Sequence, residues 1–300
     1  MSPVGVAESG AAQVLPRSFL YVPATRPELF AKATTGAADG VVLDLEDAVP
    51  LAARGEAREQ VLSWLTKPGS DDRSPDPRST AEQWVRVDAQ ALLDDLDAAV
   101  WPSLSGLFVA KCTRESLSAV AALLDRLEPE RGMAPGSVRV VGLVESAASL
   151  LDLAAMARMP RVATFGIGEA DLLADLRISR SHHSSAAVDG LRAQVVVHCA
   201  AAGLQAPVAP TSTAFRDLER FAATSRQLLD LGFRSRTAVH PAQVLVINEV
   251  FSPTAEATAE AQDVVDRFEA ARGGVTTDAA GHLVDAAVVR SAYETLQRRR

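Results

Sequence analysis

The chain has 300 residues, of which 48% are hydrophobic and 23% are charged. These proportions are those of a globular protein that buries a large core without disulfides or a structural metal. The formal net charge of −8 argues against a general nucleic-acid or anionic-membrane binder, because both need a basic face. An anionic small molecule is still compatible with it, since a pocket can be basic on an acidic protein.

Cysteine content and the first residues bear on the cellular compartment. Cys112 and Cys199 stand in apolar contexts and form no CxxC pair, which favours a reducing environment. No stretch approaches the roughly 18 apolar residues of a membrane span, and the N-terminus lacks the basic start and apolar core of a signal peptide. We therefore expect a cytoplasmic protein whose residues 1–16 form a flexible leader.

Short apolar runs alternate with amphipathic segments from residue 18 to residue 251. Most of these runs lack polar alternation, which is typical of parallel strands covered on both faces. The predicted strands are 18–22, 40–45, 84–87, 106–111, 138–144, 161–167, 204–208 and 237–240. The helical spacing between them predicts helices at 27–35, 51–65, 115–127, 147–156, 191–202 and 215–231.

This β–α alternation predicts a parallel sheet, and eight strands favour its closure into a (β/α)₈ TIM barrel spanning residues 17–252. Two polar stretches, 67–82 and 177–190, are expected to be loops, the second of them at the barrel mouth. Residues 253–300 exceed what eight β/α units require. They predict a helix at 253–272, a short hairpin within 275–284 and a helix at 286–297, as an extension that packs on the barrel or on a neighbouring subunit.

Charged or polar side chains end or follow six of the predicted strands. They are Asp44, Glu46, Asp47, Arg86, Asp88, Lys111, Glu145, Glu169, Asp171, Asp175 and His240. In a β/α barrel these strand ends meet on one face, where active sites lie. Clustered carboxylates repel each other unless a cation joins them, and oxygen ligands favour Mg²⁺ or Mn²⁺ over Zn²⁺. A metal beside an arginine would suit a 2-oxo acid, whose carboxylate the guanidinium can bind.

Each of these side chains also has a structural interpretation. A carboxylate at a strand end often caps the next helix. His240 precedes Pro241 and, taken alone, is more often structural than catalytic. Lys111 is equally compatible with a structural place at the rim of the barrel.

The motifs in their order resemble the citrate lyase β-subunit-like group of the HpcH/HpaI aldolase superfamily, which includes malyl-CoA and citramalyl-CoA lyases. The resemblance runs from about Arg17 to Arg290. It rests on LYVPATRPELFAKA, GVVLDLEDAV, WVRVD, GLVES, GEADLLADL, AVHPAQVLVINEVFSP and GHLVDAAVVR.

The resemblance implies a Mg²⁺-dependent carbon–carbon lyase that acts on a 3-hydroxyacyl-CoA such as malyl-, citramalyl- or citryl-CoA. It would cleave this thioester to an acyl-CoA and a 2-oxo acid, or form it from them. It also implies a homotrimer or a hexamer. By the resemblance, Glu145 and Asp171 hold Mg²⁺, and Arg86 grips the oxo-acid carboxylate. The other residues it implies are Tyr21, Arg26 and Lys32 for CoA or substrate, and Glu46 and Asp47 near the metal and its waters.

The resemblance also gives Asp285 a catalytic role. In the CoA lyases of the group, an aspartate of the C-terminal segment reaches into the neighbouring subunit's site as the acid/base at the thioester's α-carbon, and the matching residue here is Asp285. From the sequence alone, an aspartate before a helix is an N-cap.

Departures from the group's pattern affect the surroundings of the metal site. Asp88 replaces the usual Asn and adds a negative charge that could divert Arg86, and Arg177 replaces a Gly. The alternatives to the lyase are a CoA-independent class II pyruvate aldolase and a catalytically weak partner subunit that acts on a carrier-bound substrate. The aldolase branch carries a histidine after strand two, whereas EDAVPLAARG has none.

Overall fold

The computed structural model describes residues 14–67 and 81–299. The chain divides into two compact units, of which one is residues 16–251 and the other includes the residues from 252 onward. The predicted leader lies almost wholly outside the described residues, and so does most of the predicted loop at 67–82. No helix in the described part of the chain is both long and apolar enough to cross a membrane.

The first unit is a closed barrel of eight parallel strands in chain order, as predicted. The strands are β1 (Ser18–Pro23), β2 (Gly40–Asp44), β3 (Glu82–Asp88), β4 (Leu104–Ala110), β5 (Arg139–Val144), β6 (Val162–Ile167), β7 (Val208–Ala209) and β8 (Ser235–Ala238). β8 pairs with β1 in parallel and closes the ring.

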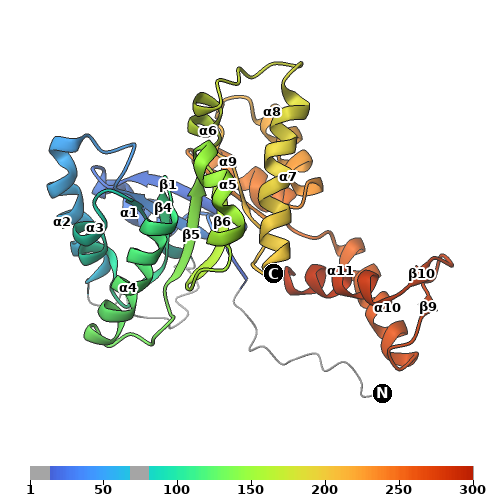
Figure 1. Ribbon diagram of the computed structural model, residues 1–300. Helices are drawn as coiled ribbons and strands as arrows, with labels where there is room; N and C mark the ends of the chain where they lie inside the picture. The colour runs from blue at the N-terminus through green and yellow to red at the C-terminus, as the bar shows by residue number, and fades with distance from the viewer. Residues whose placement is uncertain (1–13, 68–80, 300) are drawn as a thin grey trace. The chain divides into compact units, whose positions relative to one another are not determined.

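Helices connect the strands and surround the sheet (Figure 1). They are η1 (Pro27–Leu29), α1 (Phe30–Thr34), η2 (Leu51–Ala53), α2 (Arg54–Leu65), α3 (Leu92–Ala99), α4 (Arg114–Glu130), α5 (Ala147–Met156), α6 (Glu169–Asp175), α7 (Ser185–Ala201), α8 (Leu218–Asp230) and α9 (Pro241–Val250). Capping boxes at Thr113 and Ser146 begin α4 and α5, so each of these helices starts directly after its strand.

An aromatic cluster fills the barrel interior. Phe19, Trp84 and Phe108 meet edge to face, with ring centroids 5.1–5.6 Å apart, and all three are fully buried. Gly106 provides the space for them, because a Cβ there would lie 2.2 Å from the Trp84 ring. This packed interior supports the residues that end the strands, as in other barrels of this class.

Three sequence predictions are corrected by the fold. The seventh strand is only Val208–Ala209, so the segment 204–207 leads into it instead of belonging to it. The eighth strand lies at Ser235–Ala238, earlier than the predicted 237–240. The predicted loop at 177–190 is partly helical, because α7 already begins at Ser185.

The second unit contains α10 (Ala255–Ala270), the antiparallel pair β9 (Thr276–Thr277) and β10 (Leu283–Val284), and α11 (Ala286–Gln297). These are the predicted helix, hairpin and helix. Ala261, Val265 and Ala292 form its small core. Thr254 caps α10 and Asp285 caps α11.

Candidate active site at the barrel mouth

An arginine paired with carboxylates lies at the carboxyl ends of β2 and β3. The Arg86 guanidinium forms two hydrogen bonds of 2.7 Å with Asp44, from Nε to Oδ1 and from Nη2 to Oδ2. Its Nη1 lies 3.1 Å from Glu46 Oε2 and 3.1 Å from Asp47 Oδ2. Burial acts to lower the pKa of Arg86, but the hydrogen bonds with Asp44 and the nearby negative charges together outweigh it, and the pKa is raised. The guanidinium therefore stays charged.

Tyr21 of β1 covers this arginine. The Arg86 Cζ lies 5.0 Å from the centroid of the Tyr21 ring, which is within the range of a cation–π contact. Burial raises the pKa of the Tyr21 hydroxyl well above its usual value, so the phenol is neutral. The pair presents a cation and a neutral hydroxyl at the mouth.

A second buried carboxylate follows β5. Glu145 is 5% exposed, and its Oε2 accepts a hydrogen bond of 2.5 Å from the backbone N of Lys111. Burial raises the pKa of Glu145 to about 7, and the nearby charges of Glu46 and Asp171 act in the same direction. The charge of Arg86 acts in the opposite direction but does not offset burial, so an additional cation beside this carboxylate would stabilise its charged form.

Gly168 lets the backbone after β6 approach this carboxylate. A Cβ at this position would lie only 2.1 Å from Glu145 Oε1. Asp171 follows on the first turn of α6, where it is exposed. Among the described residues, no group of three or more His, Cys, Asp or Glu side chains forms a metal site. A pair of carboxylates fits Mg²⁺, which often takes one or two protein carboxylates and keeps several waters.

The remaining residues predicted for CoA or substrate lie after β1. Arg26 is exposed before η1, where its guanidinium pairs with Glu28. Lys32 is exposed on α1. The structure thus places Tyr21 in the cluster with Arg86, whereas Arg26 and Lys32 project from the β1–α1 segment.

Four of the strand-end residues have structural partners instead. Glu169 is held by Arg192 of α7, with both hydrogen bonds at 2.8 Å. Asp175 accepts a hydrogen bond of 2.7 Å from the backbone N of Ala147. His240 caps α9 through its Nδ1. Asp88 completes the four, and its partner is a second arginine.

Asp88 does not pair with Arg86, contrary to the expectation from the sequence. Asp88 Oδ2 lies 2.6 Å from Nη1 of Arg54 on α2, and its Oδ1 accepts a hydrogen bond from the backbone N of Gln90. Arg54 therefore takes up the additional negative charge, and Arg86 keeps Asp44 as its partner. The sequence contains no local sign of this pair, because the two residues lie 34 positions apart.

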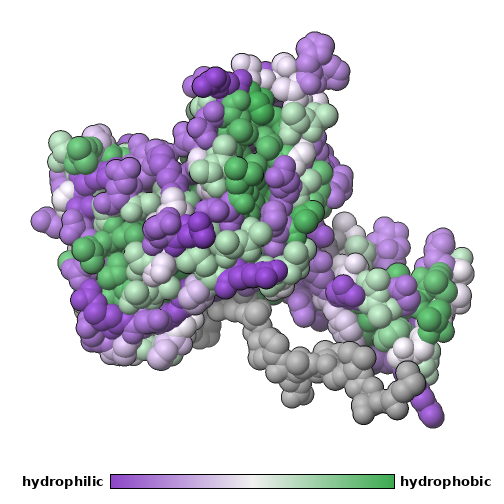
Figure 2. Space-filling view, viewed as in Figure 1, coloured by the Kyte–Doolittle hydropathy of each residue, from purple (hydrophilic) through white to green (hydrophobic). Residues whose placement is uncertain are grey.

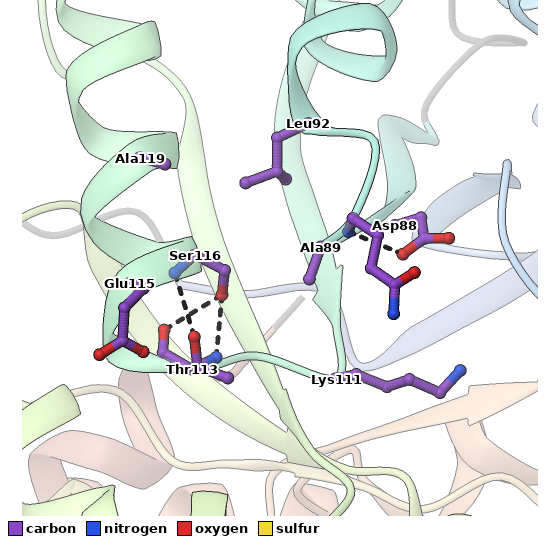
Figure 3. A pocket seen from close by; sticks show the side chains of 9 residues that line it. Asp88, Ala89, Leu92, Lys111, Thr113, Glu115, Ser116 and Ala119 are labelled. Carbon is purple, nitrogen blue, oxygen red and sulfur yellow. Dashed lines mark hydrogen bonds between the residues drawn. The ribbon is translucent and has the colours of Figure 1, made fainter.

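A cavity of about 410 Å³ opens between the β3–α3 loop and the start of α4. Figure 3 shows that the side chains of Asp88 and Lys111 border it on one side and those of Thr113 and Ser116 on the other. The Lys111 side chain extends away from the α4 terminus. Its Nζ contacts Glu46 and lies 3.7 Å from Asp47 Oδ1.

Two contributors to this site were missed by the sequence analysis. Gly168 had one indication only, a glycine directly after a buried strand, where close backbone approach is common. Arg54 lies on a helix whose polar face gives no indication of a partner.

In the second unit, Asp285 accepts hydrogen bonds from the backbone N of Ala287 and Val288 at 2.9 and 3.1 Å, which is the N-cap geometry that its position predicts.

The fold and this mouth define a (β/α)₈ barrel whose strand ends gather carboxylates around an arginine. The family model described as HpcH/HpaI aldolase/citrate lyase matches residues 17–241. The chain belongs to this family.

Two similar proteins match almost the whole chain. An L-malyl-CoA/beta-methylmalyl-CoA lyase of Cereibacter sphaeroides is 31% identical over 92% of this chain and 92% of its own length. A citrate lyase subunit beta-like protein of Deinococcus radiodurans is 30% identical over 95% and 98%. Among solved structures, the protein CitE of Mycobacterium tuberculosis in complex with magnesium, acetoacetate and coenzyme A is similar with a TM-score of 0.70 and 26% identity, covering 96% of this chain and 99% of that chain.

Proposed function

We propose that this protein is a Mg²⁺-dependent carbon–carbon lyase that cleaves or forms a 3-hydroxyacyl-CoA such as malyl-, citramalyl- or citryl-CoA. The observation that carries the proposal is the buried Glu145, held against Gly168 and beside Asp171, next to the Arg86 guanidinium. A metal and a guanidinium side by side bind the two functional groups of a 2-oxo acid. The names of the relatives support the CoA thioester as the other half of the substrate.

The roles of the residues follow from their places. Glu145 and Asp171 would hold the divalent ion, which would supply Lewis acidity at the keto oxygen. Glu46 and Asp47 would orient its waters. Asp44 holds Nε and Nη2 of Arg86, so the oxo-acid carboxylate would bind at Nη1 in exchange for its contacts with Glu46 and Asp47.

In cleavage, the hydroxyl would give its proton to water or to a nearby basic group, the carbon–carbon bond would break, and its electron pair would move into the thioester as an enolate. Asp285 would then deliver a proton to the α-carbon, and it would remove that proton in the direction of synthesis. Tyr21 borders the reacting groups, and Arg26 and Lys32 provide positive charge for the phosphates of CoA.

The assembly and the location belong to the same proposal. A homotrimer or hexamer would bring Asp285 of one subunit to the mouth of the next. Figure 2 shows apolar surface over the region of α5 and α7, where Leu151 and Val197 are 85% and 61% exposed, and such surface favours association. The cytoplasm fits Cys112 and Cys199, which are buried and not joined in a disulfide.

The decisive experiment incubates the protein and Mg²⁺ with malyl-CoA, citramalyl-CoA and citryl-CoA, and measures the oxo acid and the free thiol separately. A lyase releases oxo acid without thiol. Thiol without oxo acid would instead indicate a thioesterase, the activity named for another relative that is 30% identical over 93% of this chain. Absence of both products with all three substrates would contradict the proposal.

The variants Glu145→Gln and Asp171→Asn should lower turnover by at least about a hundredfold, because changing residues that only orient metal ligands already costs about 10- to 100-fold. Asp285→Asn keeps the cap of α11, since Asn and Asp are equally good N-caps. A loss of turnover in this variant with unchanged thermal stability therefore separates proton transfer from capping.

A further inference from the structure

Lys111 has a strained backbone at the carboxyl end of β4. Its φ is 49°, in the left-handed region that is unfavourable for a residue with a side chain. Residues held in such conformations tend to cluster at active sites, where the surrounding structure imposes them. The strained backbone of Lys111 therefore indicates that specific contacts hold this residue in place.

The left-handed turn directs the two polar groups of Lys111 to two different carboxylates. The backbone N donates a hydrogen bond to Glu145 Oε2. The side-chain Nζ forms an ion pair with Glu46 Oε1. The residue directly after β4 thus connects the carboxylate after β5 with the acidic segment after β2.

Glu46 is shared between two cations. Its Oε1 contacts Lys111, and its Oε2 lies 3.1 Å from Arg86 Nη1. The side chain of Glu46 is only 4% exposed, so water cannot replace a lost partner. Without the ammonium, Arg86 would remain as the cation that contacts this buried carboxylate in the described part of the chain, and Glu46 would hold its Nη1 more strongly.

We propose that Lys111 is a positioning residue that shares the charge of Glu46 and so weakens the hold of Glu46 on Arg86 Nη1, which can then exchange Glu46 for the carboxylate of the oxo acid. The inference rests on the proposed function, because it assumes that Arg86 binds this carboxylate. In this inference the backbone N–H of Lys111 orients the proposed metal ligand Glu145, and its ammonium acts on Glu46 beside the substrate-binding Arg86.

The two roles can be separated by substitution. Lys111→Gly keeps the N–H toward Glu145 and adopts the left-handed conformation without strain, but it removes the ammonium. Lys111→Arg keeps a cation near Glu46. Lys67→Met is the matched control, since Lys67 lies over the Trp64 ring at the end of α2.

The test measures KM for glyoxylate with acetyl-CoA, and for pyruvate with acetyl-CoA, together with Mg²⁺ affinity by calorimetry. Lys111→Gly should raise KM for the oxo acid by about tenfold or more, because the buried Glu46 carboxylate loses a charge partner. Mg²⁺ affinity should stay within about threefold of wild type, because the backbone contact is retained. The KM of Lys111→Arg should lie close to that of wild type, and the KM of Lys67→Met should equal it.

An unchanged KM in Lys111→Gly beside an active wild type would overturn this inference alone. Equal losses of Mg²⁺ affinity and thermal stability in the Gly and Arg variants would also overturn it, because they would indicate a purely structural lysine. A wild type that forms no product from either pair would overturn the proposed function first. If Lys111→Gly does not fold, Lys111→Met is measured in the same way, with the same expected KM.

Discussion

Glu145 is a carboxylate that the barrel holds by contacts on opposite sides. The backbone N of Lys111 donates to one of its oxygens, and Gly168 lies against the other. Ser149 accepts a hydrogen bond from the Glu145 backbone N at 3.3 Å, so the strand end is held as well. The carboxylate is therefore oriented before any cation binds, which lowers the cost of binding.

This arrangement predicts a specific sensitivity at Gly168. Gly168→Ala would place a methyl group 2.1 Å from Glu145 Oε1, so the carboxylate must move. We expect Mg²⁺ affinity, measured by calorimetry, to fall by about tenfold or more, the range seen when residues that support metal ligands are changed. Gly190→Ala is the control, because its Cβ would have no neighbour within 4 Å. Equal Mg²⁺ affinity in the two variants would contradict this geometry.

Adjacent β/α units are joined by a buried ion pair behind the mouth. Arg58 Nε of α2 lies 2.7 Å from Asp95 Oδ1 of α3, and Asp95 Oδ2 accepts a hydrogen bond of 2.9 Å from the backbone N of Asp88. Asp95 is 1% exposed, and burial raises its pKa. The network therefore fixes the end of β3, where Arg86 and Asp88 are located.

Removing the cation of this pair should destabilise the barrel. Arg58→Met leaves the Asp95 carboxylate buried without its partner, and we expect a loss of about 2–3 kcal/mol at pH 8, less than for a fully buried pair because Arg58 is partly exposed. Arg114→Met is the control, since its pair with Asp152 is exposed on both sides. Urea unfolding measures both free energies.

The same variant should depend on pH in a defined direction. The pKa of Asp95 in the folded wild type is already above its ordinary value, and loss of Arg58 raises it further. Between the unfolded and folded pKa values the folded state binds more protons, so stability falls as pH rises. The destabilisation by Arg58→Met should therefore be smaller at pH 5 than at pH 8, and a larger loss at pH 5 would contradict this explanation.

At the scale of the molecule, the described residues form a barrel with its own core and a second unit whose core is small. The second unit contains Asp285, while Arg86, Glu145 and Asp171 belong to the barrel. Because the proposed trimer brings Asp285 from a neighbouring subunit, two inactive variants should complement each other when they are expressed together.

Co-expression of Arg86→Met and Asp285→Asn tests this sharing. Each site would take Arg86 from one subunit and Asp285 from the next. With random mixing of equal amounts, both residues are intact in about a quarter of the sites, so about a quarter of wild-type turnover is expected. As a control, a chain that carries both substitutions and is expressed alone should be inactive. Absence of recovery in proven mixed oligomers would indicate that Asp285 does not act in a neighbouring subunit.

Some of these features follow from local patterns along the chain. Apolar runs without polar alternation predict strands buried on both faces, and eight of them predicted the barrel that is observed. The boundaries of α5 and α11 also agree with the prediction, because capping residues and apolar spacing lie within one segment. The residues at the strand ends were identified in the same way, since their place follows from the strands.

Other features depend on residues that are distant in sequence. The pairing of Asp88 with Arg54, the bridge from Lys111 to Glu46 and the contact of Gly168 with Glu145 all join different β/α units. Ion pairs and raised pKa values arise from distances and burial, which exist only after the barrel has closed. Local patterns could therefore predict the barrel and which residues meet at its mouth, whereas the choice of partners among them required the folded structure.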